Sequence, residues 1–121
     1  MTLKIKTYYS PNFDPKKRKK TSIDFLIFHY TGMKYERNAI NKLTYFKSKV
    51  SSHYFIKKDG TIINMVPEKF IAWHAGVSCW KNHKNLNDKS IGIEIQNSGH
   101  SGKYESFSNK QIKSLSLLTK I

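Results

Sequence analysis

Residues 23–30, which read IDFLIFHY, decide the fold. This stretch is an almost unbroken apolar run, rich in β-branched and aromatic residues, and it has the length of a single strand. An apolar run without alternation is typical of a strand that is buried on both faces. We therefore predict a doubly buried strand that ends at the turn-forming pair Thr31-Gly32.

Beyond this run the chain alternates between helical and extended patterns. Apolar side chains recur at helical spacing within residues 36–49, which predicts an amphipathic helix. Two strand-like runs follow, at 52–57 and 61–66, and Asp59-Gly60 lies between them. An Asp-Gly pair in this position is a strong signal for a β-hairpin. The apolar positions of the helix are Ala39, Ile40, Leu43 and Phe46.

The stretch SIGIEIQ, residues 90–96, alternates cleanly between apolar and other residues. As a strand it directs its isoleucines to one face, and Gly92, Glu94 and Gln96 to the other. The residues Ser-Asn-Lys-Gln at 108–111 match a capping box, and an apolar helical pattern follows them. Strands interleaved with helices predict an α/β fold with a mixed β-sheet.

The chain is strongly basic, because its 121 residues include 22 Lys and Arg against 8 Asp and Glu, a formal net charge of +14. We expect residues 1–22 to form a basic N-terminal extension and loop, with the charged run at 16–20 exposed, and residues 23–121 to form one domain. The charge favours an anionic partner, either nucleic acid or a cell-wall polymer with carboxylates and phosphates. Lys-rich usage can equally reflect genome composition.

What the sequence lacks restricts the classes of protein. The single cysteine, Cys79, excludes an intramolecular disulfide and the zinc modules that need two or more cysteines. No apolar run reaches the ~18 residues of a membrane span, and the N-terminus lacks the apolar stretch of a signal peptide. We therefore expect a cytoplasmic protein without a membrane span, with export by another route as the alternative, and we also expect a monomer.

Some residues have the chemistry of a functional site. His29 lies at the C-terminal end of the first strand, where sites gather in α/β folds, although a lone strand histidine is more often structural. Glu94 lies between two isoleucines; it either pairs with a lysine or acts as a general base whose pKa is raised in a dry cleft. The segment at 73–76, Trp-His-Ala-Gly, indicates either a cleft wall or packing under a loop.

Several of these segments together match one known family. The pieces are FHYTG at 28–32, SSHYFIKKDGTI at 51–62, VPE at 66–68, AWHAGVS at 72–78 and NDKSIGIEIQN at 87–97. In their order and spacing they resemble the type 2 N-acetylmuramoyl-L-alanine amidases, which are related to phage lysozyme amidases and peptidoglycan recognition proteins. The resemblance implies a central mixed β-sheet flanked by helices, with a substrate groove over the sheet.

The resemblance also implies roles for individual residues. His29 matches the family's first zinc ligand and Glu94 its catalytic acid, while the positions lining the substrate cleft match His53, Trp73 and His74. The implied reaction is zinc-dependent hydrolysis of the amide bond between N-acetylmuramic acid and L-alanine, in peptidoglycan or muropeptides. Zinc acidifies a water, and Glu94 takes the proton and returns it to the leaving amine.

One departure from the family pattern limits this expectation. The family's second histidine and third ligand, an Asp or Cys, follow the last helix, and this sequence ends at Ile121 before that point. His100 comes too early to be assigned as a ligand. We therefore expect an incomplete zinc site and impaired hydrolysis. The alternatives are a non-catalytic peptidoglycan-binding relic and a basic nucleic-acid-binding module, although no specific nucleic-acid motif supports the latter.

Overall fold

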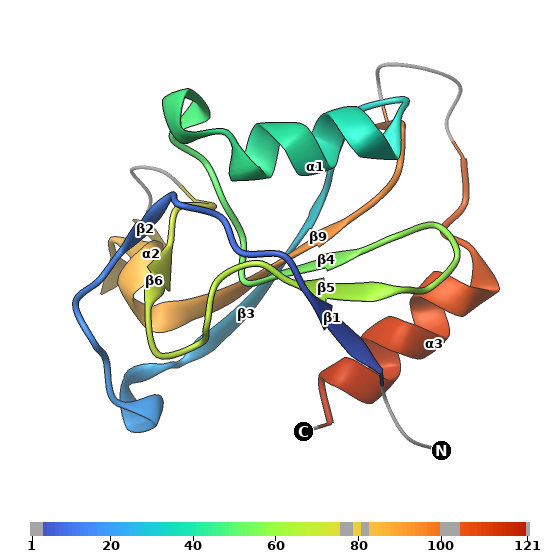
Figure 1. Cartoon of the computed structure of the whole chain (residues 1–121). Coiled ribbons are helices and arrows are strands. Elements are labelled where there is room, and N and C mark those ends of the chain that lie inside the picture. The colour runs from blue at the N-terminus through green and yellow to red at the C-terminus, as the bar shows by residue number, and fades with distance from the viewer. Residues whose placement is uncertain (1–3, 76–78, 81–82, 100–104, 121) are drawn as a thin grey trace.

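The computed structural model describes residues 4–75, 79–80, 83–99 and 105–120. At its centre is a five-stranded β-sheet with the strand order β1-β5-β4-β9-β3 (Figure 1). β3, β9 and β4 run parallel, β5 is antiparallel to β4, and β1 is parallel to β5. The predicted α/β fold with a mixed sheet is confirmed. The strands are β1 (Ile5–Thr7), β3 (Phe25–Tyr30), β4 (Tyr54–Ile56), β5 (Ile62–Asn64) and β9 (Ser90–Ile95).

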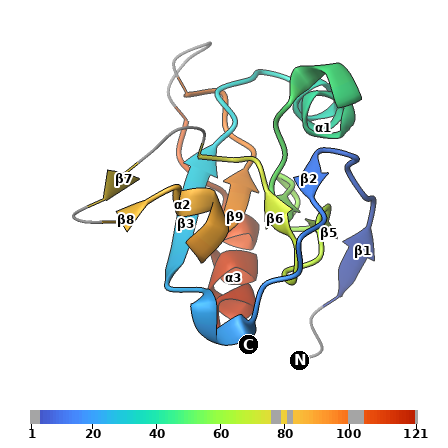
Figure 2. The same cartoon turned by 90° about the vertical axis from the view of Figure 1, so that its left-hand side faces the viewer.

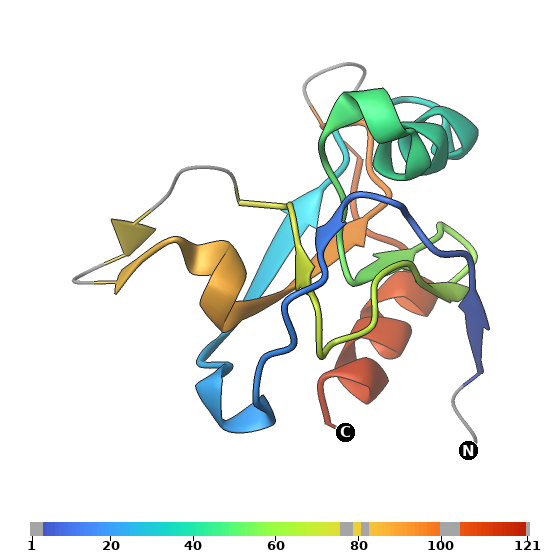
Figure 3. The same ribbon diagram turned by 60° about the vertical axis from the view of Figure 1, so that its left-hand side comes forward.

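Shorter elements surround this sheet. β2 (Phe13–Asp14) pairs with β6 (Ile71–Ala72), and β7 (Cys79–Trp80) pairs with β8 (His83–Lys84) in a ribbon that stands away from the sheet (Figures 2 and 3). No helix in the described ranges has both the length and the apolarity needed to cross a bilayer. The helical elements are η1 (Lys20–Ser22), α1 (Glu36–Thr44), η2 (Phe46–Ser48), α2 (Leu86–Lys89) and α3 (Asn109–Leu118).

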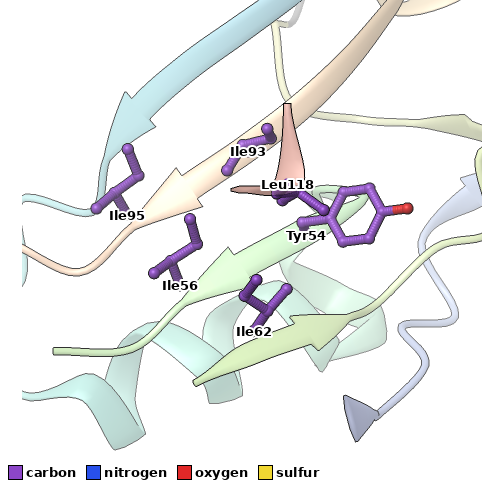
Figure 4. Packing of buried hydrophobic residues seen from close by; sticks show 6 residues of the cluster. All are labelled: Tyr54, Ile56, Ile62, Ile93, Ile95 and Leu118. Carbon is purple, nitrogen blue, oxygen red and sulfur yellow. The ribbon is translucent and has the colours of Figure 1, made fainter. Parts of the chain in front are cut away.

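Helices α1 and α3 cover opposite faces of the sheet (Figure 1). The isoleucines of β9 pack on the α3 side, as the alternation in residues 90–96 predicted. Each fully buried isoleucine contributes roughly 1.5–3 kcal/mol to stability. The cluster on the α1 side consists of Ala39, Leu43, Phe55, Ile63 and Met65. The cluster on the α3 side consists of Tyr54, Ile56, Ile62, Ile93, Ile95 and Leu118 (Figure 4).

The prediction that the first strand is buried on both faces is wrong. β3 lies at one edge of the described sheet, and Leu26, Phe28 and Tyr30 are 47%, 50% and 48% exposed. The burial of β3 alternates along the strand, with the more buried residues on the α1 side. On the opposite side α3 packs on β4, and a pocket of about 300 Å³ lies between the outer residues Phe28 and Tyr30 of β3 and Ile112 of α3. A uniformly apolar run therefore did not distinguish an edge strand from a central one.

The helix observed in this region, α1, is shorter than the helix predicted for residues 36–49. α1 ends at Thr44, whose hydroxyl donates to the carbonyl of Ile40, and Tyr45 is extended. Phe46 consequently leaves the apolar face and is 58% exposed in η2. The helical spacing of Phe46 had no local stop signal in the sequence, so only the structure shows where the helix ends.

The turn and cap signals are confirmed. Gly60 adopts a φ of +88°, and the carboxylate of Asp59 accepts a hydrogen bond from the backbone N–H of Thr61 at 2.8 Å. At the start of α3, the Ser108 hydroxyl accepts from the backbone N–H of Gln111, whose side chain accepts from the backbone N–H of Ser108. A helix cap of this kind stabilises a protein by about 1 kcal/mol.

The N-terminal segment is tied to the domain more closely than a loop would be. β1 extends the central sheet, and the side chain of Asn12 is buried and donates to the carbonyls of Tyr45 and Val50. In the basic run the lysines are exposed, as expected, but Arg18 is half-buried. Its guanidinium donates to three backbone carbonyls, those of Glu68, Asn87 and Asp88. Arg18 therefore joins three segments of the fold.

Candidate active site

His29 and Glu94 lie directly opposite each other on neighbouring parallel strands. In the register of β3 and β9, His29 is the partner of Glu94, and β4 places Phe55 on the other side of Glu94. Paired residues point to the same face of a sheet. Because Phe55 packs in the α1-side cluster, His29 and Glu94 also face α1.

A pocket of about 190 Å³ opens on this face of the sheet. His29 and Glu94 line it from the sheet, Trp73 and His74 line it from the segment after β6, and Lys42 lines it from α1. Segments far apart in the sequence therefore meet here. Every predicted site residue except His53 reaches the pocket.

The carboxyl group of Glu94 is strongly perturbed. Burial raises its pKa to about 7, an effect that the positive charge of Lys42 partly opposes. The ion pairs found among the described residues, Lys57–Glu36 and Lys58–Glu105, do not include Glu94. Of the two sequence interpretations, the carboxylate with a raised pKa is favoured over the structural salt bridge. Such a group both accepts and donates protons near neutral pH.

The imidazoles of His29 and His74 contact each other. Nε2 of His29 lies 3.1 Å from Nδ1 of His74, and Nε2 of His74 lies 3.0 Å from the hydroxyl of Ser90. The ring of His74 packs directly on Gly92, where a Cβ atom would come within 2.4 Å of it. Burial lowers the pKa of His29, and it lowers that of His74 to about 3 with help from the neighbouring histidines. Both rings are therefore neutral at physiological pH.

His53 lies beneath the pocket instead of on its wall. Its side chain is 0% exposed, and Nδ1 accepts a hydrogen bond from the backbone N–H of Gly92. Nε2 therefore carries the proton, which it donates to the carbonyl of Phe70 at 2.9 Å. Burial lowers the pKa of His53 to about 4. The prediction that His53 lines the cleft does not agree with this placement, because both ring nitrogens are hydrogen-bonded to backbone groups inside the fold.

Trp73 is held at the pocket by backbone hydrogen bonds. Its N–H donates to the hydroxyl of Ser51 and its carbonyl accepts from the N–H of Ser51, each at 2.9 Å. The next two backbone N–H groups, those of His74 and Ala75, donate to the side-chain oxygen of Asn87. Of the two interpretations of this segment, a wall of the pocket agrees with the structure.

The fold and this pocket agree with a known family of proteins. A family profile described as N-acetylmuramoyl-L-alanine amidase matches residues 19–121. This chain belongs to the N-acetylmuramoyl-L-alanine amidase family. The family resemblance found in the sequence is thus confirmed.

Two curated amidases show the extent of the similarity. The chain is 40% identical over 84 residues to the N-acetylmuramoyl-L-alanine amidase AmiD of Escherichia coli, an overlap of 64% of this chain and 29% of AmiD. It is 30% identical over 129 residues to the 1,6-anhydro-N-acetylmuramyl-L-alanine amidase AmpD of Haemophilus influenzae, which covers 93% of this chain and 67% of that amidase. The chain therefore spans less than a third of AmiD.

Solved amidase structures have the same fold. A selenomethionine derivative of AmpD superposes with a TM-score of 0.77 at 25% identity, over 98% of this chain and 73% of AmpD. AmpDh3 of Pseudomonas aeruginosa, in complex with an anhydromuramic pentapeptide, superposes with a TM-score of 0.74 at 34% identity. That match covers 88% of this chain and 46% of AmpDh3. The predicted amidase-like sheet flanked by helices is confirmed.

The described residues do not by themselves form the zinc site that family membership implies. None of the described groups of His, Cys, Asp and Glu brings together three side chains that could hold a metal ion. A catalytic zinc ion normally takes three protein ligands. His29 and His74 offer two imidazoles, but the nitrogens that face each other are joined by a hydrogen bond. His100, which was not assigned as a ligand, lies outside the described residues.

The sequence did not identify three residues that shape this site. Lys42 reaches the pocket from α1. In the sequence only its position next to the apolar Leu43, which is buried, could have indicated that it lies near the site. Ser90 and Asn87 fall inside a segment that matched the family, but a serine or an asparagine there has no pattern of its own. Their partners, His74 and its backbone, are distant in the sequence.

Proposed function

We propose that this protein hydrolyses the amide bond between N-acetylmuramic acid and L-alanine in peptidoglycan fragments. The observation that carries the proposal is the pairing of His29 with Glu94 in one pocket, in a chain of the amidase family. The preferred substrates are anhydro-muropeptides, since AmpD is named for the 1,6-anhydro substrate and AmpDh3 binds an anhydromuramic pentapeptide.

Glu94 performs the proton transfers in this proposal. With a pKa of about 7, a large fraction of Glu94 is ionised at neutral pH and can take a proton from the attacking water. The oxygen of that water bonds to the amide carbonyl carbon. The protonated carboxyl then donates to the nitrogen of the leaving L-alanine as the C–N bond breaks. The proton removed in the first step is thus returned in the second.

The other site residues bind and orient in this proposal. Trp73 offers an aromatic surface to the sugar or the stem peptide, and His74 supports His29 from within the pocket wall. His29 remains a proposed zinc ligand, and a zinc ion would supply a Lewis acid for the amide carbonyl. His53 has a supporting role, because it anchors Gly92 beneath the ring of His74.

The test is an assay for release of stem peptides with a free N-terminal alanine, read by mass spectrometry. Anhydro-muropeptides and intact peptidoglycan are offered separately, each with and without added zinc. We expect release from the anhydro-muropeptide, and a loss of at least about 10²-fold in the Glu94→Gln variant. Glu105→Gln is the matched control, because Glu105 is a surface carboxylate paired with Lys58.

Each outcome of this assay has a defined meaning. Release that depends on Glu94 supports amide hydrolysis. Binding of the muropeptide without release, under all conditions, would reject hydrolysis and favour the non-catalytic binding protein. The nucleic-acid hypothesis rests on the charge, on the exposed lysines of residues 16–20 and on exposed aromatic rings that could stack on bases, those of Tyr8, Tyr9 and Tyr30. The cytoplasmic location and the monomeric state stay predictions.

A further inference from the structure

We propose that Ser90 fixes the tautomer of His74, and that His74 in turn holds the proton of His29 on Nε2. Ser90 and His74 are then positioning residues, which decide which nitrogen of His29 is left with a free lone pair. The proposal follows from the direction of three consecutive hydrogen bonds. It concerns the same pocket as the proposed hydrolysis, but it does not depend on that reaction.

The first hydrogen bond sets the direction of the other two. The hydroxyl of Ser90 lies 2.6 Å from the backbone carbonyl of Leu86, and a carbonyl oxygen can only accept. The single hydroxyl proton of Ser90 therefore points to Leu86. In its contact with His74 at 3.0 Å, the Ser90 oxygen must accept, so Nε2 of His74 carries a proton.

The second step passes this constraint to His29. A neutral imidazole has one N–H, so protonation of Nε2 leaves Nδ1 of His74 with its lone pair. Nε2 of His29 lies 3.1 Å from that Nδ1 and must be the donor. The proton of neutral His29 is thereby placed on Nε2. Its Nδ1 is the nitrogen with the available lone pair.

The surroundings prevent the rings from adopting the opposite arrangement. Ser90 is 0% exposed, so no bulk water can replace its hydroxyl as the partner of His74. Gly92 closes one face of the His74 ring, and Asn87 holds the backbone at His74 and Ala75. Reversing the chain would bring two lone pairs or two protons together at a buried contact, which is unfavourable.

The consequence is a specific assignment for His29. Any electrophile that His29 binds, a metal ion or an N–H group of a substrate, must approach Nδ1 while Nε2–H stays bonded to His74. Ligating histidines commonly donate their other N–H to an acceptor that sets the ring's orientation and basicity. Here the acceptor is the imidazole of His74, whose own tautomer is set by its hydrogen bond to Ser90.

The test is ¹⁵N NMR of the histidine rings in metal-free protein, at a pH above the ordinary histidine pKa. We expect the Nε2–H signature for both His29 and His74. In Ser90→Ala the Nδ1–H form of His74 should appear, because its Nε2–H has lost its acceptor. Ser90→Thr, which keeps a hydroxyl, should restore the wild-type tautomer.

Ser52→Ala is the matched control, since Ser52 is also 0% exposed and donates to a backbone carbonyl, that of Tyr54, away from the paired rings. It should leave both tautomers unchanged. An Nδ1–H signature for either ring in the wild type, or an unchanged His74 in Ser90→Ala, overturns the proposal. If Ser90→Ala does not fold, the wild-type spectrum decides alone. Because this measurement needs neither zinc nor turnover, it is independent of the outcome of the hydrolysis assay.

Discussion

The imidazole of His74 rests on the backbone of Gly92, so closely that a Cβ atom at position 92 would lie 2.4 Å from Cγ of the ring. Glycine is thus required at this point of β9 by the approach of a side chain from another segment. The same face of β9 carries Glu94 two residues later. β9 therefore accommodates the ring of His74 at Gly92 and carries the carboxyl group of Glu94.

We expect Gly92→Ala to destabilise the protein by about 1–3 kcal/mol, because the new methyl group overpacks the ring of His74. The expected loss should be smaller when His74→Ala is already present, since the clash is then removed. Denaturant unfolding of the two single variants and the double variant measures this coupling. Additive effects would show that the contact is not the cause.

The second prediction concerns Glu94 and the pH dependence of stability. Its pKa is about 7 in the folded state against an ordinary value of 4.5, so the folded state favours the protonated form. The ionisation of Glu94 should therefore contribute a loss of stability as pH rises from 4.5 to 7, and Glu94→Gln should lack this contribution. Above pH 7 the variant should be more stable, by on the order of 2 kcal/mol after allowance for solvent in the pocket.

Glu105→Gln provides the control for that experiment. Hydrogen bonds with Lys58 and Ser98 lower the pKa of Glu105, so its effect on the pH dependence has the opposite direction. Unfolding curves at matched pH values distinguish the two carboxylates. Equal slopes for wild type and Glu94→Gln would contradict the raised pKa.

Lys42→Met should raise the pKa of Glu94 further, because the positive charge of Lys42 lowers it in the wild type. A ¹³C titration of the Glu94 carboxyl carbon measures the change directly. If the proposed hydrolysis is present, its rising limb should move to higher pH in parallel. Lys47→Gln is the control: Lys47 lies over the exposed ring of Phe46, and its removal should leave the titration unchanged.

His53→Gln should weaken the fold and also reduce its sensitivity to acid. The variant leaves the backbone N–H of Gly92 without its acceptor, which costs about 1–3 kcal/mol. In the wild type, His53 has a pKa of about 4 against an ordinary 6.5, so it contributes a loss of stability as pH falls through that interval. Thermal unfolding from pH 7 to pH 4 should show a shallower decline in the variant than in the wild type.

Substitutions of two phenylalanines should differ in their effect on stability, because one lies in the core of the sheet and the other at its edge. Phe55 is 0% exposed in β4, and Phe55→Ala should cost about 3–5 kcal/mol. Phe28 is 50% exposed in β3, and Phe28→Ala should cost less, on the order of 1 kcal/mol. A comparable loss at both positions, measured by denaturant unfolding, would mean that the outer face of β3 is covered in solution.

The sequence predicted correctly those features that depend only on residues close together in the chain. The alternation around Ile93 identified the two faces of β9, and Asp59-Gly60 identified the hairpin, because both depend on near neighbours. The uniform run before His29 could not show that β3 is an edge strand, because strand order depends on distant pairings.

The same distinction applies to the site. His29 and Glu94 were recognisable as polar residues among apolar neighbours. Their alignment depends on a pairing between strands more than sixty residues apart, which no local pattern contains. His53 matched the family as a cleft residue, but only its contacts with Gly92 and Phe70 show that it lies beneath the pocket.

The alignment of β3 with β9 has a consequence for quality control during folding. A slip of one residue would turn Glu94 towards α3 and expose Ile93 to the pocket, so the error that separates the two site residues also dismantles the core. Misaligned molecules should thus be unstable and open to degradation. They should not accumulate as well-folded but incompetent protein.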